Sequence, residues 1–179
     1  EKHALIRKGN HAEGLIIYGV PEQALDKIFQ LDKYSQLKSE FRNENGIIIG
    51  TKLAESINTL IDGDIILLNP EKIKTHQVFK AKIFTVINTF QTNFPEYDRL
   101  LAFIPLKAAQ NYFELDSNIS GILVNVIDPQ SIEDVDIIIS DALGTLPFIT
   151  TTWKERHTSL LKWLNIYDLP IKLIMFFIT

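Results

Sequence analysis

Short apolar runs separated by polar turns recur along the first two thirds of the chain, which is the pattern of a strand-rich fold. Glycine, proline and asparagine stand between many of the runs, as they do in tight connections between strands. The pattern predicts strands over residues 3–7, 14–20, 47–49, 65–68, 79–84 and 100–104.

Three other segments carry apolar residues at the three- and four-residue spacing of a helix. Pro21 and Pro105 stand where a helix would begin, and Thr51 can cap a third helix. The segment 95–98 (Pro-Glu-Tyr-Asp) is predicted to be a polar turn between two strands. The predicted apolar helix faces are Ala24, Leu25 and Ile28; Leu53, Ile57 and Leu60; and Leu106, Ala109 and Phe113.

The last third of the chain predicts a strand, a helix and a second strand in succession. Residues 121–127 (GILVNVI) and 148–152 (FITTT) have the composition of strands. Between them, Asp128-Pro129 is typical of a helix start and Gly144 of a helix end. A connection of this length implies a parallel crossover, with the helix packed on one face of a sheet. The apolar stripe of this helix would be Ile132, Val135, Ile139 and Ala142.

A final helix is predicted to start at Thr152, because Thr152 and Glu155 match the capping-box pattern. Its apolar stripe would be Trp153, His157, Leu160, Leu161 and Leu164. The nearly all-apolar run over residues 171–179 is far shorter than the roughly 20 residues of a membrane-spanning helix. It fits either a buried terminal element or the beginning of a membrane helix.

The order and spacing of several short motifs resemble the periplasmic domain of FtsX/MacB-type ABC transporter permeases. The resemblance is closest to the LolC/LolE lipoprotein-releasing family. It rests on the motifs YGVP at 18–21, EYD at 96–98, IPL at 104–106 and AQ at 109–110, and on Trp153. Gly50, Leu53, Ala54, Gly63 and Asp64 match the family pattern in the segment between.

The resemblance implies an α+β fold of the MacB-like periplasmic core type. Residues 1–168 would form the periplasmic domain, and residues 169–179 would begin a truncated transmembrane helix. Within the domain, residues 1–20 and 105–168 would form a porter-like α/β subdomain. Residues 21–104 would form an inserted, β-rich, sabre-like subdomain.

The resemblance also implies that this domain is not itself an enzyme. The chain would be the periplasmic segment of a bacterial inner-membrane permease that extracts lipoproteins and hands them to a periplasmic chaperone. A separate cytoplasmic subunit would hydrolyse ATP, so no cofactor is expected in this domain. The expected partners are a second permease subunit in a homo- or heterodimer, the ATPase subunit, the lipoprotein and the chaperone.

The candidate partner-contact site is the connection that follows the predicted strand 65–68. It comprises Pro70, Lys72, Ile73, Lys74 and Thr75. In LolC-type subunits the corresponding hairpin, the hook, grips the chaperone. Here the connection is shorter and has no proline beyond Pro70, so an LolE-type or homodimeric subunit is an alternative. The plain structural alternative is a solvated hairpin loop.

Composition and charge exclude several other functions. A net charge of −4 and a pI near 5.6 argue against a nucleic-acid surface, which needs a basic stripe. The chain has no cysteine, and its four histidines are scattered. The turn 62–64 (Asp-Gly-Asp) lacks the further ligands of a calcium loop. Glu96 and Asp98 form the best carboxylate pair, and we interpret them as turn and cap residues.

Two other classes of protein remain compatible with the sequence. The first is an efflux or cell-division permease of the MacB or FtsX kind, which would keep the fold and change the cargo. The second is a soluble α/β ligand-binding or enzyme domain without recognisable motifs. A parent gene with apolar segments on both sides of this region would favour a permease.

Overall fold

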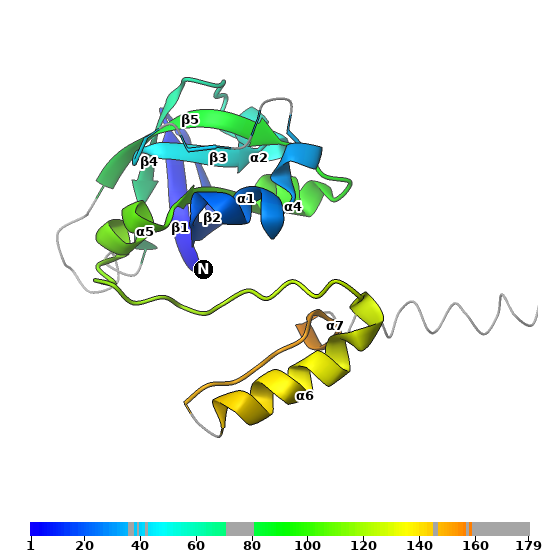
Figure 1. The fold of residues 1–179 in the computed structure, drawn as a ribbon. Coiled ribbons are helices and arrows are strands. Elements are labelled where there is room, and N and C mark those ends of the chain that lie inside the picture. Colours follow the sequence, from blue (N-terminus) through cyan, green and yellow to red (C-terminus); the bar gives the residue numbers. More distant parts are fainter. Residues whose placement is uncertain are drawn as a thin grey trace, which may run out of the picture. The chain divides into compact units, whose positions relative to one another are not determined.

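The computed structural model describes residues 1–35, 38, 40–41, 43–70, 81–144, 147–156 and 158 (Figure 1). The chain divides into two compact units, residues 1–124 and residues 125–179. Each unit is described here by itself.

The first unit is built on a closed β-barrel (Figure 1). The barrel order is β1-β2-β6-β3-β5-β4, so each of these strands has a neighbour on both sides. The pairs β2–β6 and β3–β5 are parallel, and the other pairs are antiparallel. The strands are β1 (Lys2–Lys8), β2 (His11–Val20), β3 (Gly46–Gly50), β4 (Asp64–Leu68), β5 (Ala81–Phe90) and β6 (Leu101–Pro105).

Alternate residues of the strands point into the barrel and fill it with apolar side chains. Ile6, Ile47, Leu67, Phe84 and Ile104 are all fully buried in this interior cluster. The barrel is therefore a packed core rather than a channel.

A second apolar cluster lies on the outer face of β2, β6, β3 and β5. The helix α1 (Glu22–Lys27) and the 3-10 turn η1 (Leu31–Lys33) cover this face and bury Leu25 and Leu31 against it. Phe103 lies at the centre, with its ring 4.7 Å from that of Phe29 and 5.7 Å from that of Phe90. Half of the barrel wall is thus covered by the chain's own segment after β2.

Short helices close the two ends of the barrel. The helices α2 (Thr51–Ser56) and α4 (Pro95–Leu100) lie at the end where β3 and β5 finish, since Gly50 and Phe90 are paired there. The helix α5 (Leu106–Phe113) follows β6 at the opposite end and buries Tyr112 and Phe113. α5 approaches β2 closely, because a Cβ at Gly19 would lie 2.2 Å from that of Ala109.

The second unit contains the 3-10 turn η2 (Pro129–Ser131), α6 (Ile132–Leu143) and α7 (Trp153–Arg156). The predicted caps are confirmed. The Asp128 carboxylate accepts a hydrogen bond from the Gln130 amide at 3.0 Å. The Thr152 amide donates to the Glu155 side chain at 3.0 Å, and the Glu155 amide donates to Thr152 Oγ1 at 3.2 Å.

The predicted strand–helix–strand crossover is wrong in its two strands. The helix is present as α6, but residues 121–126 and 148–152 have no strand pairing. Ile122 and Ile149 are 80% and 81% exposed. Apolar, β-branched segments form strands only where a neighbouring strand satisfies their backbone groups, and the sequence pattern does not supply that neighbour.

The predicted division into subdomains also differs from the structure. β1 and β2, within residues 1–20, pair with β4 and β6 of the expected insert, so both belong to one barrel. The boundary between the compact units falls after Val124 rather than at residues 20 and 104. The mixed α and β composition agrees with the prediction.

Three local predictions are corrected as well. The N-cap of α2 is Gly50 instead of Thr51, and the helix ends at Ser56, which leaves Leu60 81% exposed. The predicted polar turn over residues 95–98 belongs to the helix α4.

Within the described residues, no helix has the length and apolar character needed to cross a bilayer. The segment 169–179, predicted to begin a membrane helix, lies outside those residues.

Candidate partner-binding site

The two strands that flank the predicted contact residues, β4 and β5, meet them at the α5 end of the barrel. Because β5 is parallel to β3, and β3 is antiparallel to β6, β5 begins where β6 ends. β4 finishes at the same end, followed by the buried Asn69 and the half-buried Pro70. Lys72, Ile73, Lys74 and Thr75, the other predicted contact residues, lie outside the described residues.

On β4 and β5, part of the barrel wall is apolar and exposed. Ile66 and Ile83 are directly opposite each other on β4 and β5, and they are 36% and 59% exposed. Arg7 of β1 is opposite Ile66 on the other side and is also exposed. Residues directly opposite on neighbouring strands point to the same face of a sheet, so these three side chains form one surface. Residues 65–68 are all apolar in the sequence, so no alternation of apolar and polar residues marks Ile66 as exposed.

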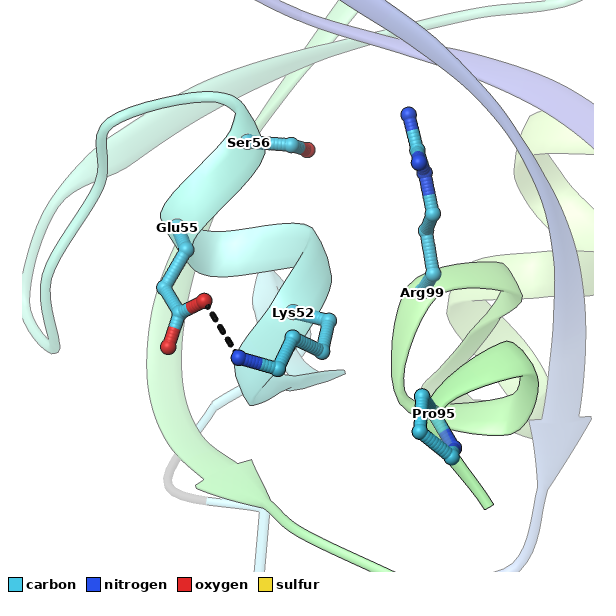
Figure 2. Close-up of a pocket in the computed structure, with 5 residues that line it drawn as sticks. All are labelled: Lys52, Glu55, Ser56, Pro95 and Arg99. Carbon is cyan, nitrogen blue, oxygen red and sulfur yellow. Dashed lines mark hydrogen bonds and ion pairs between the residues drawn. The ribbon is translucent and has the colours of Figure 1, made fainter.

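A shallow groove lies between α2 and α4, at the other end of the barrel (Figure 2). Its volume is about 410 Å³, and it is lined by Lys52, Glu55, Ser56, Pro95 and Arg99.

The charges of this groove are largely paired. Lys52 Nζ lies 2.9 Å from Glu55 Oε2, and this hydrogen bond, with the carboxylate charge, raises the pKa of Lys52. Arg99 forms a 3.1 Å ion pair with Glu13 of β2. These side chains are mostly exposed, so the pairs add little stability. The groove offers no converging set of reactive groups.

The carboxylates of the EYD segment do not act as a pair. Asp98 is buried, with 2% exposure, and its Oδ1 accepts hydrogen bonds from the Thr92 amide and Thr92 Oγ1, both at 2.8 Å. Glu96 is exposed on the same helix. Asp98 therefore fixes the connection between β5 and α4 from within the helix, instead of acting as the predicted turn or cap residue.

We expect Asp98→Ala to lower the free energy of unfolding by about 2 kcal/mol, because the partly buried Thr92 amide loses its acceptor. Glu96→Ala on the same helix is the matched control and should change it by less than about 0.5 kcal/mol. Urea unfolding followed by circular dichroism measures both. Equal effects of the two substitutions would contradict the structural role of Asp98.

Elsewhere in the described part of the chain, the titratable groups do not assemble into a catalytic or metal site. No group of three or more potential metal ligands occurs among the described residues. Tyr112 is buried against Phe84 and Phe113, and burial raises the pKa of its hydroxyl to about 12. The hydroxyl is therefore protonated at neutral pH, and Tyr112 serves as a core residue.

Comparisons with known proteins agree with the resemblance seen in the sequence. No protein-family model matches the chain. The lipoprotein-releasing system transmembrane protein LolC of Neisseria meningitidis is 27% identical over 133 residues. The match covers 72% of this chain but only 32% of that protein, so the chain spans about a third of its length.

A solved structure supports the fold. The extracellular domain of the noncanonic ABC-type transporter YknZ from Gram-positive bacteria superposes with a TM-score of 0.51 at 15% identity. The superposition covers 80% of this chain and 73% of that domain. Both comparisons confirm the resemblance: the chain is similar to the periplasmic or extracellular domain of ABC transporter permeases, and to a LolC protein in particular.

Proposed function

We propose that this chain is a periplasmic domain of a bacterial inner-membrane ABC permease that releases lipoproteins. The observation that carries the proposal is the similarity to LolC over 133 residues, which includes most of the chain. In this role the domain extracts lipoproteins together with a second permease subunit and hands them to a periplasmic chaperone. A separate cytoplasmic subunit hydrolyses ATP, and the domain itself holds no cofactor.

The physical character of the barrel supports a mechanical role. Its interior is filled by side chains such as Ile6, Phe84 and Ile104, which leaves no space for an acyl chain. A densely packed barrel transmits displacement without deforming, because packed interiors have low compressibility. The cargo would therefore be moved along the surface of this unit.

The fold similarity to YknZ favours a second candidate. An export permease of the MacB or FtsX kind would use the same domain for a different cargo. The two candidates differ in their response to lipoprotein.

Reconstitution of the full-length permease tests the proposal. The permease is placed in proteoliposomes with its ATPase, its sister subunit and a triacylated lipoprotein. We expect ATP-dependent transfer of the lipoprotein to a soluble chaperone, and no transfer with an ATPase variant that cannot hydrolyse ATP. ATPase activity that ignores lipoprotein, with no transfer, would favour the export candidate instead.

The predicted contact loop gives a second test. Photo-crosslinking residues at Lys72 or Thr75 of the full-length permease are expected to capture the chaperone or the sister subunit. Lys52 is the matched control, since it is an exposed lysine at the opposite end of the barrel. Capture from Lys52 but from neither loop position would rule the loop out as a contact site.

A further inference from the structure

The outer side of the barrel wall formed by β1, β4 and β5 is apolar at its centre. Two rows of directly opposite residues cross it, one with Leu5 and Leu68 and one with Arg7, Ile66 and Ile83. Leu5 and Leu68 are half-buried, whereas Ile66 and Ile83 are 36% and 59% exposed. We call the following residues the wall surface: Leu5, Arg7, Asp64, Ile66, Leu68 and Ile83.

The wall surface carries one charge of each sign. The lysines of β1 and β5 belong to the inward-facing register of their strands, where they alternate with the wall residues: Lys2, Lys8 and Lys82. The outward-facing charges of β1, β4 and β5 are Arg7 and Asp64. The surface is therefore neutral as a whole, and it does not favour a strongly acidic or a strongly basic partner.

Arg7 and Asp64 both border Ile66. Arg7 lies opposite Ile66 on β1, about 5 Å away, and Asp64 lies two residues before it on β4, about 7 Å away. Arg7 Nε donates to the Gly9 carbonyl at 3.0 Å, and Asp64 Oδ1 accepts from Thr85 Oγ1 at 2.8 Å. Within the described residues, neither side chain takes part in an ion pair. Each charge can therefore pair with an opposite charge on another molecule.

We propose that the wall surface binds the same surface of a second copy, face to face. A twofold axis beside Ile66 and Ile83 brings the isoleucines of the two copies together at the centre. Because Arg7 and Asp64 lie at similar distances from Ile66 in different directions, the same axis sets Arg7 of each copy against Asp64 of the other. This doubled ion pair is the feature that selects a second copy over an unrelated partner. The contact lies wholly within the compact unit of residues 1–124.

Sedimentation velocity of the 179-residue chain over a range of concentrations tests the pairing. We expect a reversible equilibrium between monomer and dimer. Ile83→Asp places a carboxylate at the centre of the interface and should weaken association about tenfold or more. Leu60→Asp is the matched control and should leave association unchanged, because Leu60 is 81% exposed and lies outside the wall surface. Circular dichroism verifies that each variant is folded.

Charge reversal distinguishes a second copy from any other partner. Arg7→Glu sets two carboxylates against each other at both contacts of the dimer, and Asp64→Lys sets two cations against each other. Each variant alone should therefore associate about tenfold more weakly or worse. An equimolar mixture of the two variants should pair with nearly the original affinity, because every contact between one variant and the other joins opposite charges. Glu96→Lys, at an exposed position of α4, is the control and should not change association.

A chain that stays monomeric at every concentration would overturn the proposal, and so would a mixture that associates no better than its two components. Association that ignores all three wall variants would come from another surface, such as the apolar residues 171–179, and would overturn it too. The measurement involves neither cargo nor ATP. Failure of lipoprotein transfer would leave its results unchanged, so this proposal and the proposed function fail separately.

Discussion

Replacing Phe103 with alanine is expected to lower the free energy of unfolding by about 3–5 kcal/mol, the usual cost of a buried phenylalanine. Phe103 is 1% exposed, and its ring contacts those of Tyr18, Phe29 and Phe90. The loss would open a cavity between the barrel wall and the segment that covers it. Urea unfolding, monitored by far-UV circular dichroism, measures the effect.

Phe148 provides the matched control for this substitution. It is 62% exposed, and Phe148→Ala should change the free energy of unfolding by no more than about 0.5 kcal/mol. If Phe103→Ala were as mild as Phe148→Ala, the covering of the outer wall by α1 and η1 would be wrong.

Gly50→Ala should lower the free energy of unfolding by about 3 kcal/mol, through a steric clash. A Cβ at this position would lie 2.0 Å from the carbonyl oxygen of Asp98 and 2.5 Å from its Cα. These are backbone atoms of α4, so relief requires the whole helix to move. Gly50 has a φ of −68°, which alanine adopts freely. The change in the free energy of unfolding would therefore come from the steric clash and not from backbone strain.

Gly14→Ala is the control for Gly50→Ala. Gly14 also lies in a strand, but a Cβ there meets no atom within 4 Å. Alanine should raise stability slightly, by about 0.5 kcal/mol, because glycine is unfavourable in a strand interior. A Gly50→Ala variant as stable as Gly14→Ala would show that α4 does not sit against β3 as described.

Local sequence patterns predicted the strands of the barrel. They did not predict which strands pair, because the pairing joins segments far apart in the sequence. Residues 14–20 and 100–104 were predicted as strands; residues 14–20 lie in β2 and residues 101–104 in β6, while Leu100 ends the helix α4. Their parallel pairing joins segments about 80 residues apart, for which no short-range signal exists. Closure of the barrel therefore could not be predicted from the alternation of residues.

The candidate site was predicted only in part, for a similar reason. The loop after β4 was identified through a resemblance, and only Pro70 of its predicted contacts is described. The exposed surface formed by Arg7, Ile66 and Ile83 exists only because β1 and β5 are both neighbours of β4. Asp98 was interpreted as a turn or cap residue, but it lies within α4, whose N-cap is Phe94, and its burial depends on the packing of α4 against β3.

Closure of the barrel limits how this unit can associate with other chains. Every barrel strand pairs with a neighbour on both sides along at least part of its length, so none of these strands has a fully open edge. Association of copies by adding strand to strand, and addition of an extended peptide to the sheet, are therefore disfavoured. Other molecules are therefore expected to bind this unit through its side chains and loops. Substitutions there can change binding without breaking the hydrogen bonds between the strands.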